Sequence, residues 1–105
     1  MATSRSCPAE SAVKLIGGRW KIVILWYLFQ GVHRYSELRR ALSGVTQKVL
    51  THQLREMERD GLVTRRIYAQ VPPKVEYSLT SLGMSLKPVV ETIHQWGLAH
   101  GFTEK

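Results

Sequence analysis

Five polar side chains between Lys48 and Arg59 are spaced so that a helix gathers them on one face. At about 100° per residue, that sector holds Lys48, Thr51, His52, Arg55 and Arg59. Leu50, Leu54 and Met57 fall in a narrow sector roughly opposite. Ammonium, guanidinium, hydroxyl and imidazole groups are donors that contact phosphates and base edges in DNA. The pattern therefore favours a helix that is buried on its apolar side and contacts DNA with the other.

A surface helix with solvated charges is the simpler interpretation of the same pattern, and Glu56 and Glu58 near the edges of the polar strip are compatible with it. The flanking residues argue against it. Thr46 is suited to cap the helix, Gly61 is suited to end it, and residues 35–42 predict a short helix before it. A solvated surface helix does not require this preceding helix and turn.

Two β-rich runs follow, from Val63 to Tyr68 and from Val75 to Leu79, with two prolines in the loop between them. Prolines stiffen such a loop and prevent the strand ladder from continuing through it. Short helix, turn, basic helix and hairpin, in this order, predict a winged helix-turn-helix over residues 35–80. In that motif the second helix enters the major groove.

The expected DNA contacts divide by position along this motif. Base readout comes mainly from the N-terminal turns of a recognition helix, here Gln47, Lys48, Thr51 and His52, with Arg55 able to fork onto a guanine. Phosphate contacts are expected from Arg59, Arg65, Arg66 and Lys74. Arg34 and Thr46, which precede the two helices, complete the predicted DNA-binding set.

Length and charge agree with one DNA-binding domain spanning residues 1–105. The net charge is +7. From Gly31 to Lys74 there are nine Lys or Arg and four acids, so +5 of this charge lies in the segment of the predicted winged helix-turn-helix, hereafter the reader. Concentrated positive charge attracts polyanions. Residues 1–6 lack the apolar run of a leader, and the longest apolar run, residues 22–29, is far shorter than the about 20 residues of a membrane span. With a single cysteine, we expect a cytoplasmic protein without a membrane role.

The segments around the reader are expected to be helical, which makes the fold α+β and mainly helical. Helices are predicted over residues 8–16, starting at Pro8, and over residues 19–30, the second apolar nearly all round. A third is predicted over about residues 81–100, after a cap at Thr80. Its apolar residues recur with period 3.5, the seam pattern of paired helices, at Leu82, Leu86, Val89, Ile93 and Trp96.

Part of that stripe is expected in the domain's own core and part at a homodimer contact. We assign Leu82 and Leu86 to the core, while Val90 and Leu98 widen the apolar surface beyond what one small domain needs. Pro88 lies inside the predicted helix and should kink it. The expected dimer interface, formed by the helices that flank the reader, comprises Val13, Trp20, Val89, Ile93 and Trp96.

Short motifs follow one another along nearly the whole chain, from Cys7 to Trp96. They are Cys7-Pro8, Gly17-Gly18-Arg19-Trp20-Lys21, Gly31, Arg34-Tyr35-Ser36-Glu37-Leu38, Gly44-Val45-Thr46, Leu50-Thr51, Leu54-Arg55-Glu56-Met57-Glu58, Gly61-Leu62-Val63, Tyr68, Val71-Pro72-Pro73-Lys74-Val75-Glu76-Tyr77-Ser78-Leu79-Thr80 and Gly83. In this order they resemble the HxlR-type winged-helix transcriptional regulators of bacteria. The resemblance implies a homodimer, formed through the first and last helices, on a two-fold operator. It also implies that no separate ligand-binding domain exists.

Three residues depart from the pattern of that family. Arg19 stands where lysine is usual, Tyr35 where phenylalanine is usual, and Thr46 where serine is usual. We expect none of these departures to affect the reader.

Cys7 precedes Pro8 at the expected start of the first helix, where the helix dipole and nearby Arg5 favour the thiolate. Some members of the resembling family use a cysteine at this position to sense oxidants or electrophiles. The resemblance therefore implies a redox sensor at the dimer seam, with an oxidant or small electrophile as its partner. A small apolar residue packed under Trp20 or against the partner chain is the alternative.

No arrangement of residues indicates catalysis, a bound metal or another cofactor. The four histidines, His33, His52, His94 and His100, lack metal-ligand spacing with one another and with Cys7. All except His52 are expected to be packing or surface residues. The chain is thus expected to be a sequence-specific DNA-binding regulator, with repression the commoner output, or a winged-helix protein-interaction module without DNA. The cationic strip favours the first, since an adaptor has no need of it. The operator, the target genes and the inducing signal are left open.

Overall fold

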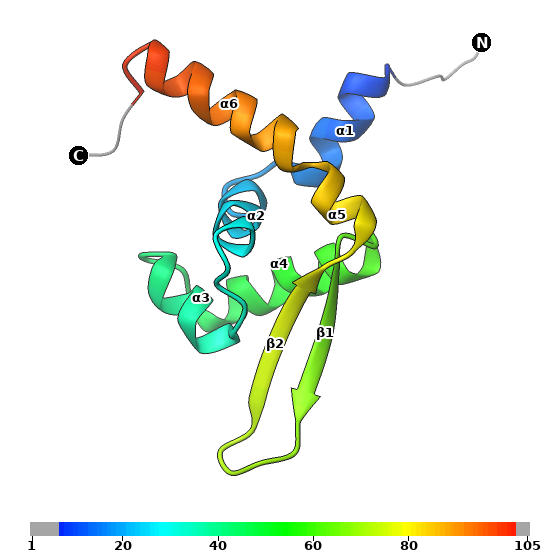
Figure 1. Cartoon of the computed structure of the whole chain (residues 1–105), viewed down its shortest axis with the longest axis vertical. Coiled ribbons are helices and arrows are strands. Elements are labelled where there is room, and N and C mark those ends of the chain that lie inside the picture. Colours follow the sequence, from blue (N-terminus) through cyan, green and yellow to red (C-terminus); the bar gives the residue numbers. More distant parts are fainter. Residues whose placement is uncertain (1–6, 103–105) are drawn as a thin grey trace.

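The computed structural model describes residues 7–102 and is mainly helical (Figure 1). Its elements, in chain order, are α1 (Pro8–Ile16), α2 (Lys21–Phe29), α3 (Tyr35–Ala41), α4 (Gln47–Arg59), β1 (Val63–Tyr68), β2 (Lys74–Leu79), α5 (Ser81–Ser85) and α6 (Lys87–Ala99). Helices α3 and α4 with the β1–β2 hairpin form a winged helix-turn-helix, so the predicted fold class is confirmed. Helices α1 and α6 lie at the end of the molecule opposite the tip of the wing (Figure 1).

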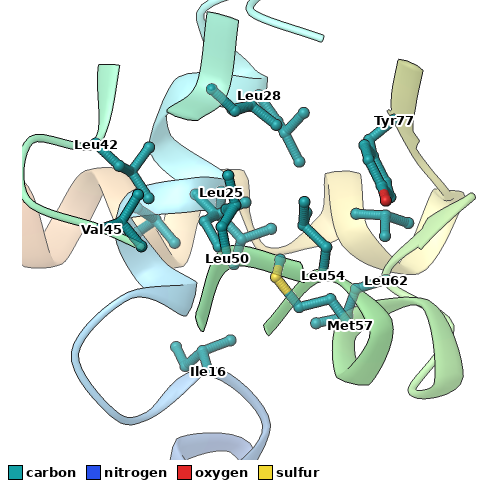
Figure 2. Packing of buried hydrophobic residues seen from close by; sticks show 14 residues of the cluster. Ile16, Leu25, Leu28, Leu42, Val45, Leu50, Leu54, Met57, Leu62 and Tyr77 are labelled. Atoms are coloured by element: carbon teal, nitrogen blue, oxygen red, sulfur yellow. The ribbon is translucent and has the colours of Figure 1, made fainter. Parts of the chain in front are cut away.

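The core forms where α2 meets the apolar side of α4. Helix α2 is apolar on nearly every side, which suits the middle of a domain. Its Leu25 is fully buried beside Leu50 and Leu54 of α4, as predicted for the apolar sector of that helix (Figure 2). The helix begins at Lys21 rather than at Arg19 because the chain first turns at Gly18, where φ is +89°.

The turn between α3 and α4 depends on Gly44, whose φ of +87° lies in the left-handed region. Thr46 then caps α4 as predicted, its Oγ1 accepting a hydrogen bond from the backbone N–H of Val49 at 3.1 Å. The residue before α3 makes no capping hydrogen bond with its side chain. The residue at that position is Arg34, whose side chain carries only donors.

The wing is a two-stranded antiparallel hairpin whose register runs from Val63 opposite Leu79 to Tyr68 opposite Lys74. A backbone bridge between Arg34 and Glu76 joins β2 to the residue before α3. The N–H of Tyr77 also donates to the carbonyl oxygen of His33 at 2.9 Å. These backbone contacts hold the wing against the helix-turn-helix.

The C-terminal segment is two helices rather than the single kinked helix that was expected. Pro88 lacks an N–H and its ring excludes the carbonyl four residues earlier, so the chain breaks at Leu86 and Pro88 occupies the first turn of α6. Leu86 packs against the core as predicted. The assignment of Leu82 to the core is wrong: Leu82 is 51% exposed, because Gly83 is the α5 residue buried against the reader. The assignment of Val90 to the apolar surface is also wrong, because Val90 is buried where α6 packs on α2.

Candidate nucleic-acid interface

Five predicted DNA contacts of α4 share one exposed side of the helix. They line a single open hollow and are Gln47, Lys48, Thr51, His52 and Arg55, hereafter the reading face. Burial of Leu50, Leu54 and Met57 on the opposite side fixes the rotation of α4 about its axis. The hydrophobic core therefore determines which polar groups point outward.

Tyr35, the first residue of α3, contacts the reading face from the side. Its hydroxyl oxygen lies 3.0 Å from Oγ1 of Thr51 and donates to the backbone oxygen of Gln47 at 3.3 Å. A phenylalanine, usual at this position in HxlR-type regulators, has no group that can make either contact. Tyr35 therefore makes two contacts with the reading face that a phenylalanine would lack.

Glu56 links the reading face to α2. Its Oε1 lies 2.7 Å from Nζ of Lys21, whose side chain is only 10% exposed, and its Oε2 lies 3.1 Å from Nε2 of His52. The hydrogen bond from Lys21, together with its positive charge, lowers the pKa of the Glu56 carboxyl below its usual value of 4.5. Glu56 is therefore the counter-ion of a buried lysine, a pairing that the sequence analysis does not predict. The only sequence signal for the pair is one lysine at the start of an otherwise apolar helix.

The cations of the wing differ in how they are engaged. Arg65 Nε lies 3.5 Å from a carboxylate oxygen of Glu58 at the end of α4. Lys74 Nζ lies 3.8 Å from a carboxylate oxygen of Glu76 and 4.3 Å from the centre of the Tyr68 ring. The exposed Arg66 lies over the same ring at 5.0 Å. Arg66 is thus the most accessible of the three wing cations.

Arg34 and Arg59 are both exposed at helix ends, the first before α3 and the second at the end of α4. Arg34 also lines a hollow, together with Lys74, between α3 and the loop of the wing. The predicted DNA-binding set omits Arg39 and Arg40, which are exposed in the last turn of α3. Their signal was present in the sequence as two adjacent arginines in the helix that precedes the recognition helix.

Large apolar side chains are exposed on α1 and α6, away from the reading face. Val13 of α1 is 61% exposed and Trp96 of α6 is 58% exposed, and Val89, Ile93 and Leu98 of α6 are exposed as well. We call these five residues the helical seam. Trp20, also predicted at the dimer interface, is only half-buried, with the Arg19 guanidinium 4.5 Å from the centre of its ring.

Cys7 is exposed at the N-cap of α1, as the sequence predicts. The backbone N–H groups of Glu10 and, second, of Ala9 lower the pKa of its thiol, although no capping hydrogen bond to the sulfur forms. Arg5, expected to assist, lies outside the described residues. Exposure of Cys7 rules out packing under Trp20 of the same protomer, which was part of the alternative interpretation.

The three histidines outside the reading face contact their own chain, as predicted. His33 Nδ1 lies 3.1 Å from the backbone oxygen of Tyr77, His94 stacks on Trp26 at 4.1 Å, and His100 stacks on Trp96 at 4.3 Å. Within residues 7–102, no three His, Cys, Asp or Glu side chains are grouped so that they could hold a metal ion. None of the helices in that part of the chain is both long and apolar enough to span a membrane.

A short helix, a turn, a helix with one polar exposed face and a two-stranded wing define a winged helix-turn-helix protein. Residues 15–105 match the model of the HxlR-like helix-turn-helix family. The chain belongs to this family and is a transcriptional regulator.

Known proteins similar to the chain are regulators of the same kind. The uncharacterised HTH-type transcriptional regulator YdeP of Bacillus subtilis is 50% identical over 91 residues, which cover 87% of this chain and 71% of YdeP. The reduced form of the redox regulator HypR superposes with a TM-score of 0.84 and 46% identity, covering 89% of this chain and 92% of HypR. The reduced form of the regulator YodB from B. subtilis superposes with a TM-score of 0.75 and 34% identity, covering 89% of this chain and 92% of YodB.

Proposed function

We propose that the protein binds double-stranded DNA sequence-specifically through α4, acting in the cytoplasm and repressing transcription where its operator overlaps a promoter. The observation that carries this proposal is the reading face, because five side chains able to bond to base edges line one open hollow. Arg55 can form a two-pronged contact with a guanine, and Gln47, Lys48, Thr51 and His52 address the neighbouring bases.

Phosphate contacts surround the reading face in this proposal. Arg66 on the wing, Arg59 at the end of α4 and Arg34, which precedes α3, are exposed. Arg65 and Lys74 each lie beside a carboxylate, so their contribution requires exchange of that partner for a phosphate. Thr46 contributes mainly as the cap that starts α4, since its oxygen already accepts from Val49.

We also propose that two copies pair through α1 and α6 and bind a two-fold operator. The helical seam exposes five large apolar side chains on elements that lie far from the reading face (Figure 1). The radius of gyration, 15.2 Å, exceeds the about 13 Å of a compact domain of this length, because the wing and α6 project from the core. Pairing through the seam would leave both readers exposed.

The proposal is tested by comparing three single substitutions on the natural operator and on unrelated DNA. Arg55→Ala should weaken operator binding by about 1–3 kcal/mol for each protomer of the dimer and relax the preference at one base pair per half-site. Arg66→Ala should weaken binding to all sequences alike and reduce the slope of affinity against salt by about 1 for each protomer of the dimer. Lys87→Ala removes an exposed cation from α6 and serves as the matched control, with both quantities unchanged.

Fluorescence anisotropy across a salt series measures both the affinity for each DNA and the slope of that affinity against salt. If the wild type binds no DNA, or if Arg55→Ala binds its operator normally, the reading face is not a DNA reader. In the first case the protein-interaction module becomes the better interpretation.

We further propose that Cys7 makes the regulator responsive to oxidants or electrophiles. The thiol is exposed, and the N–H groups at the start of α1 lower its pKa, which raises the fraction of reactive thiolate. HypR, whose oxidised form superposes with a TM-score of 0.82, is a redox regulator. Because α1 belongs to the proposed dimer contact, modification of Cys7 acts where the two readers are set relative to each other.

Diamide accepts two electrons and two protons from two thiols, which join in a disulfide, and therefore tests this proposal. The wild type should form a Cys7–Cys7 cross-link between protomers and change its operator affinity. Cys7→Ser should do neither. A wild type whose operator affinity is indifferent to diamide and to a quinone would leave Cys7 without a sensing role.

A further inference from the structure

The contact between Tyr35 and Thr51 limits how one hydroxyl of the reading face can bond. The Tyr35 oxygen lies 3.0 Å from Oγ1 of Thr51 and 3.3 Å from the carbonyl oxygen of Gln47. A phenol has one proton to donate, and a carbonyl oxygen can only accept. Both contacts are hydrogen bonds in one arrangement only: Tyr35 donates to Gln47, and Thr51 donates to Tyr35.

Another threonine of the same chain shows what Thr51 would otherwise do. In α6, Oγ1 of Thr92 donates to the carbonyl oxygen of Pro88, four residues earlier, at 2.7 Å. This back-bond is the usual one for a helical threonine. The corresponding carbonyl for Thr51 is that of Gln47, which accepts instead from the hydroxyl of Tyr35 in α3. The Thr51 side chain is therefore held by a contact between helices rather than by its own helix.

We propose that Tyr35 is a specificity-determining residue, which makes Thr51 a pure hydrogen-bond acceptor toward DNA. The inference rests on the proposed reading of DNA by α4. With its proton directed at Tyr35, Thr51 can accept from the amino groups of adenine or cytosine but cannot donate to guanine N7 and O6 or thymine O4. Tyr35 itself is a positioning residue, because it acts on the base through Thr51.

The experiment uses Tyr35→Phe, Thr51→Val and the double variant on a set of operators in which each base pair is changed singly. The wild type should prefer adenine or cytosine over guanine or thymine at one position in each half-site. Tyr35→Phe should reduce that preference about threefold to tenfold, the value of one hydrogen bond, and leave other positions unchanged. In the Thr51→Val background, Tyr35→Phe should change nothing further at that position. Tyr27→Phe, which removes a phenol hydroxyl from α2, is the matched control.

The outcomes separate this inference from the proposed function. A wild type without any sequence preference overturns the DNA-reading role of α4. A wild type with a clear preference that Tyr35→Phe leaves intact overturns the role of Tyr35 alone. Equal weakening on every operator, with a lowered melting temperature, would mean that Tyr35 only supports the packing of α3, and would also overturn the inference.

Discussion

Replacing Gly83 by alanine tests how the C-terminal helices attach to the reader. A Cβ at this position of α5 would overlap the carbonyl oxygen of Leu62 and lie 3.1 Å from Cδ2 of Leu79. The Leu62 carbonyl cannot move freely, because it accepts a hydrogen bond from the backbone N–H of Thr80 at 3.0 Å. The single hydroxyl proton of Thr80 is directed to the nearer carbonyl oxygen of Gly61. Relief of the overlap must therefore separate α5 from the start of β1.

The expected magnitude combines three contributions to the free energy of unfolding. Overpacking against a rigid neighbour costs up to about 3 kcal/mol. Weakening the hydrogen bond from the Thr80 N–H to Leu62 costs about 1 kcal/mol. Alanine returns about 1 kcal/mol through its higher helix propensity. We expect Gly83→Ala to lower the free energy of unfolding by about 1–3 kcal/mol.

Gly97→Ala is the matched control, because the same change in α6 meets no obstruction. A Cβ at Gly97 would come no nearer than 3.8 Å to Phe102, an ordinary contact, so only the propensity gain of about 1 kcal/mol remains. The two variants should therefore differ in sign. Urea unfolding followed by tryptophan fluorescence at one fixed protein concentration measures both, since association changes apparent stability. A Gly83→Ala variant as stable as Gly97→Ala would refute the packing argument.

Two further substitutions test the helical seam and the buried lysine. Trp96→Ala removes a large exposed ring from the seam and should weaken dimerisation by at least about 2 kcal/mol, lowering dimer and operator affinity together; a wild type that is monomeric by light scattering at micromolar concentration would contradict this. The lowered pKa of Glu56 gives the fold a contribution that is present above the usual carboxyl pKa of 4.5 and is lost as the pH falls through the lower pKa of the folded state. Glu56→Gln should therefore reduce the free energy of unfolding at neutral pH and flatten the loss of stability in acid. Glu91→Gln, an exposed position of α6, should keep the wild-type dependence of stability on pH. Identical acid profiles for the two variants would exclude the pair between Glu56 and Lys21.

Local sequence signals predict most of the elements of the reader, because neighbouring residues determine where these elements begin and end. The left-handed turn at Gly44, the cap at Thr46 and the left-handed Gly61 set the limits of α4 without any help from distant residues. The alternation of buried and exposed sectors then gives the reading face. The same logic fails after Thr80, where one stripe of period 3.5 runs through two helices and Leu86 is the break between them.

Close approach between segments explains the errors in the C-terminal part. Leu82 matches the apolar stripe, but the neighbouring Gly83 allows α5 to approach the Leu62 backbone, and this rotation turns Leu82 outward. Val90 is predicted on a surface and instead fills the contact between α6 and α2. Which face of a helix is buried depends on its partner, and the partner is not encoded in the period of the stripe.

The bonding state of the reading face depends on residues that lie outside α4. Tyr35, in α3, lies within hydrogen-bond distance of the hydroxyl of Thr51. Lys21, in α2, pairs with the Glu56 carboxylate that also contacts His52. Neither partner is near its target in the sequence, and neither carries a spacing that points to it. Helical periodicity can therefore predict which side chains lie on the reading face, whereas contacts from α2 and α3 determine which of their donors and acceptors are free to bond to another molecule.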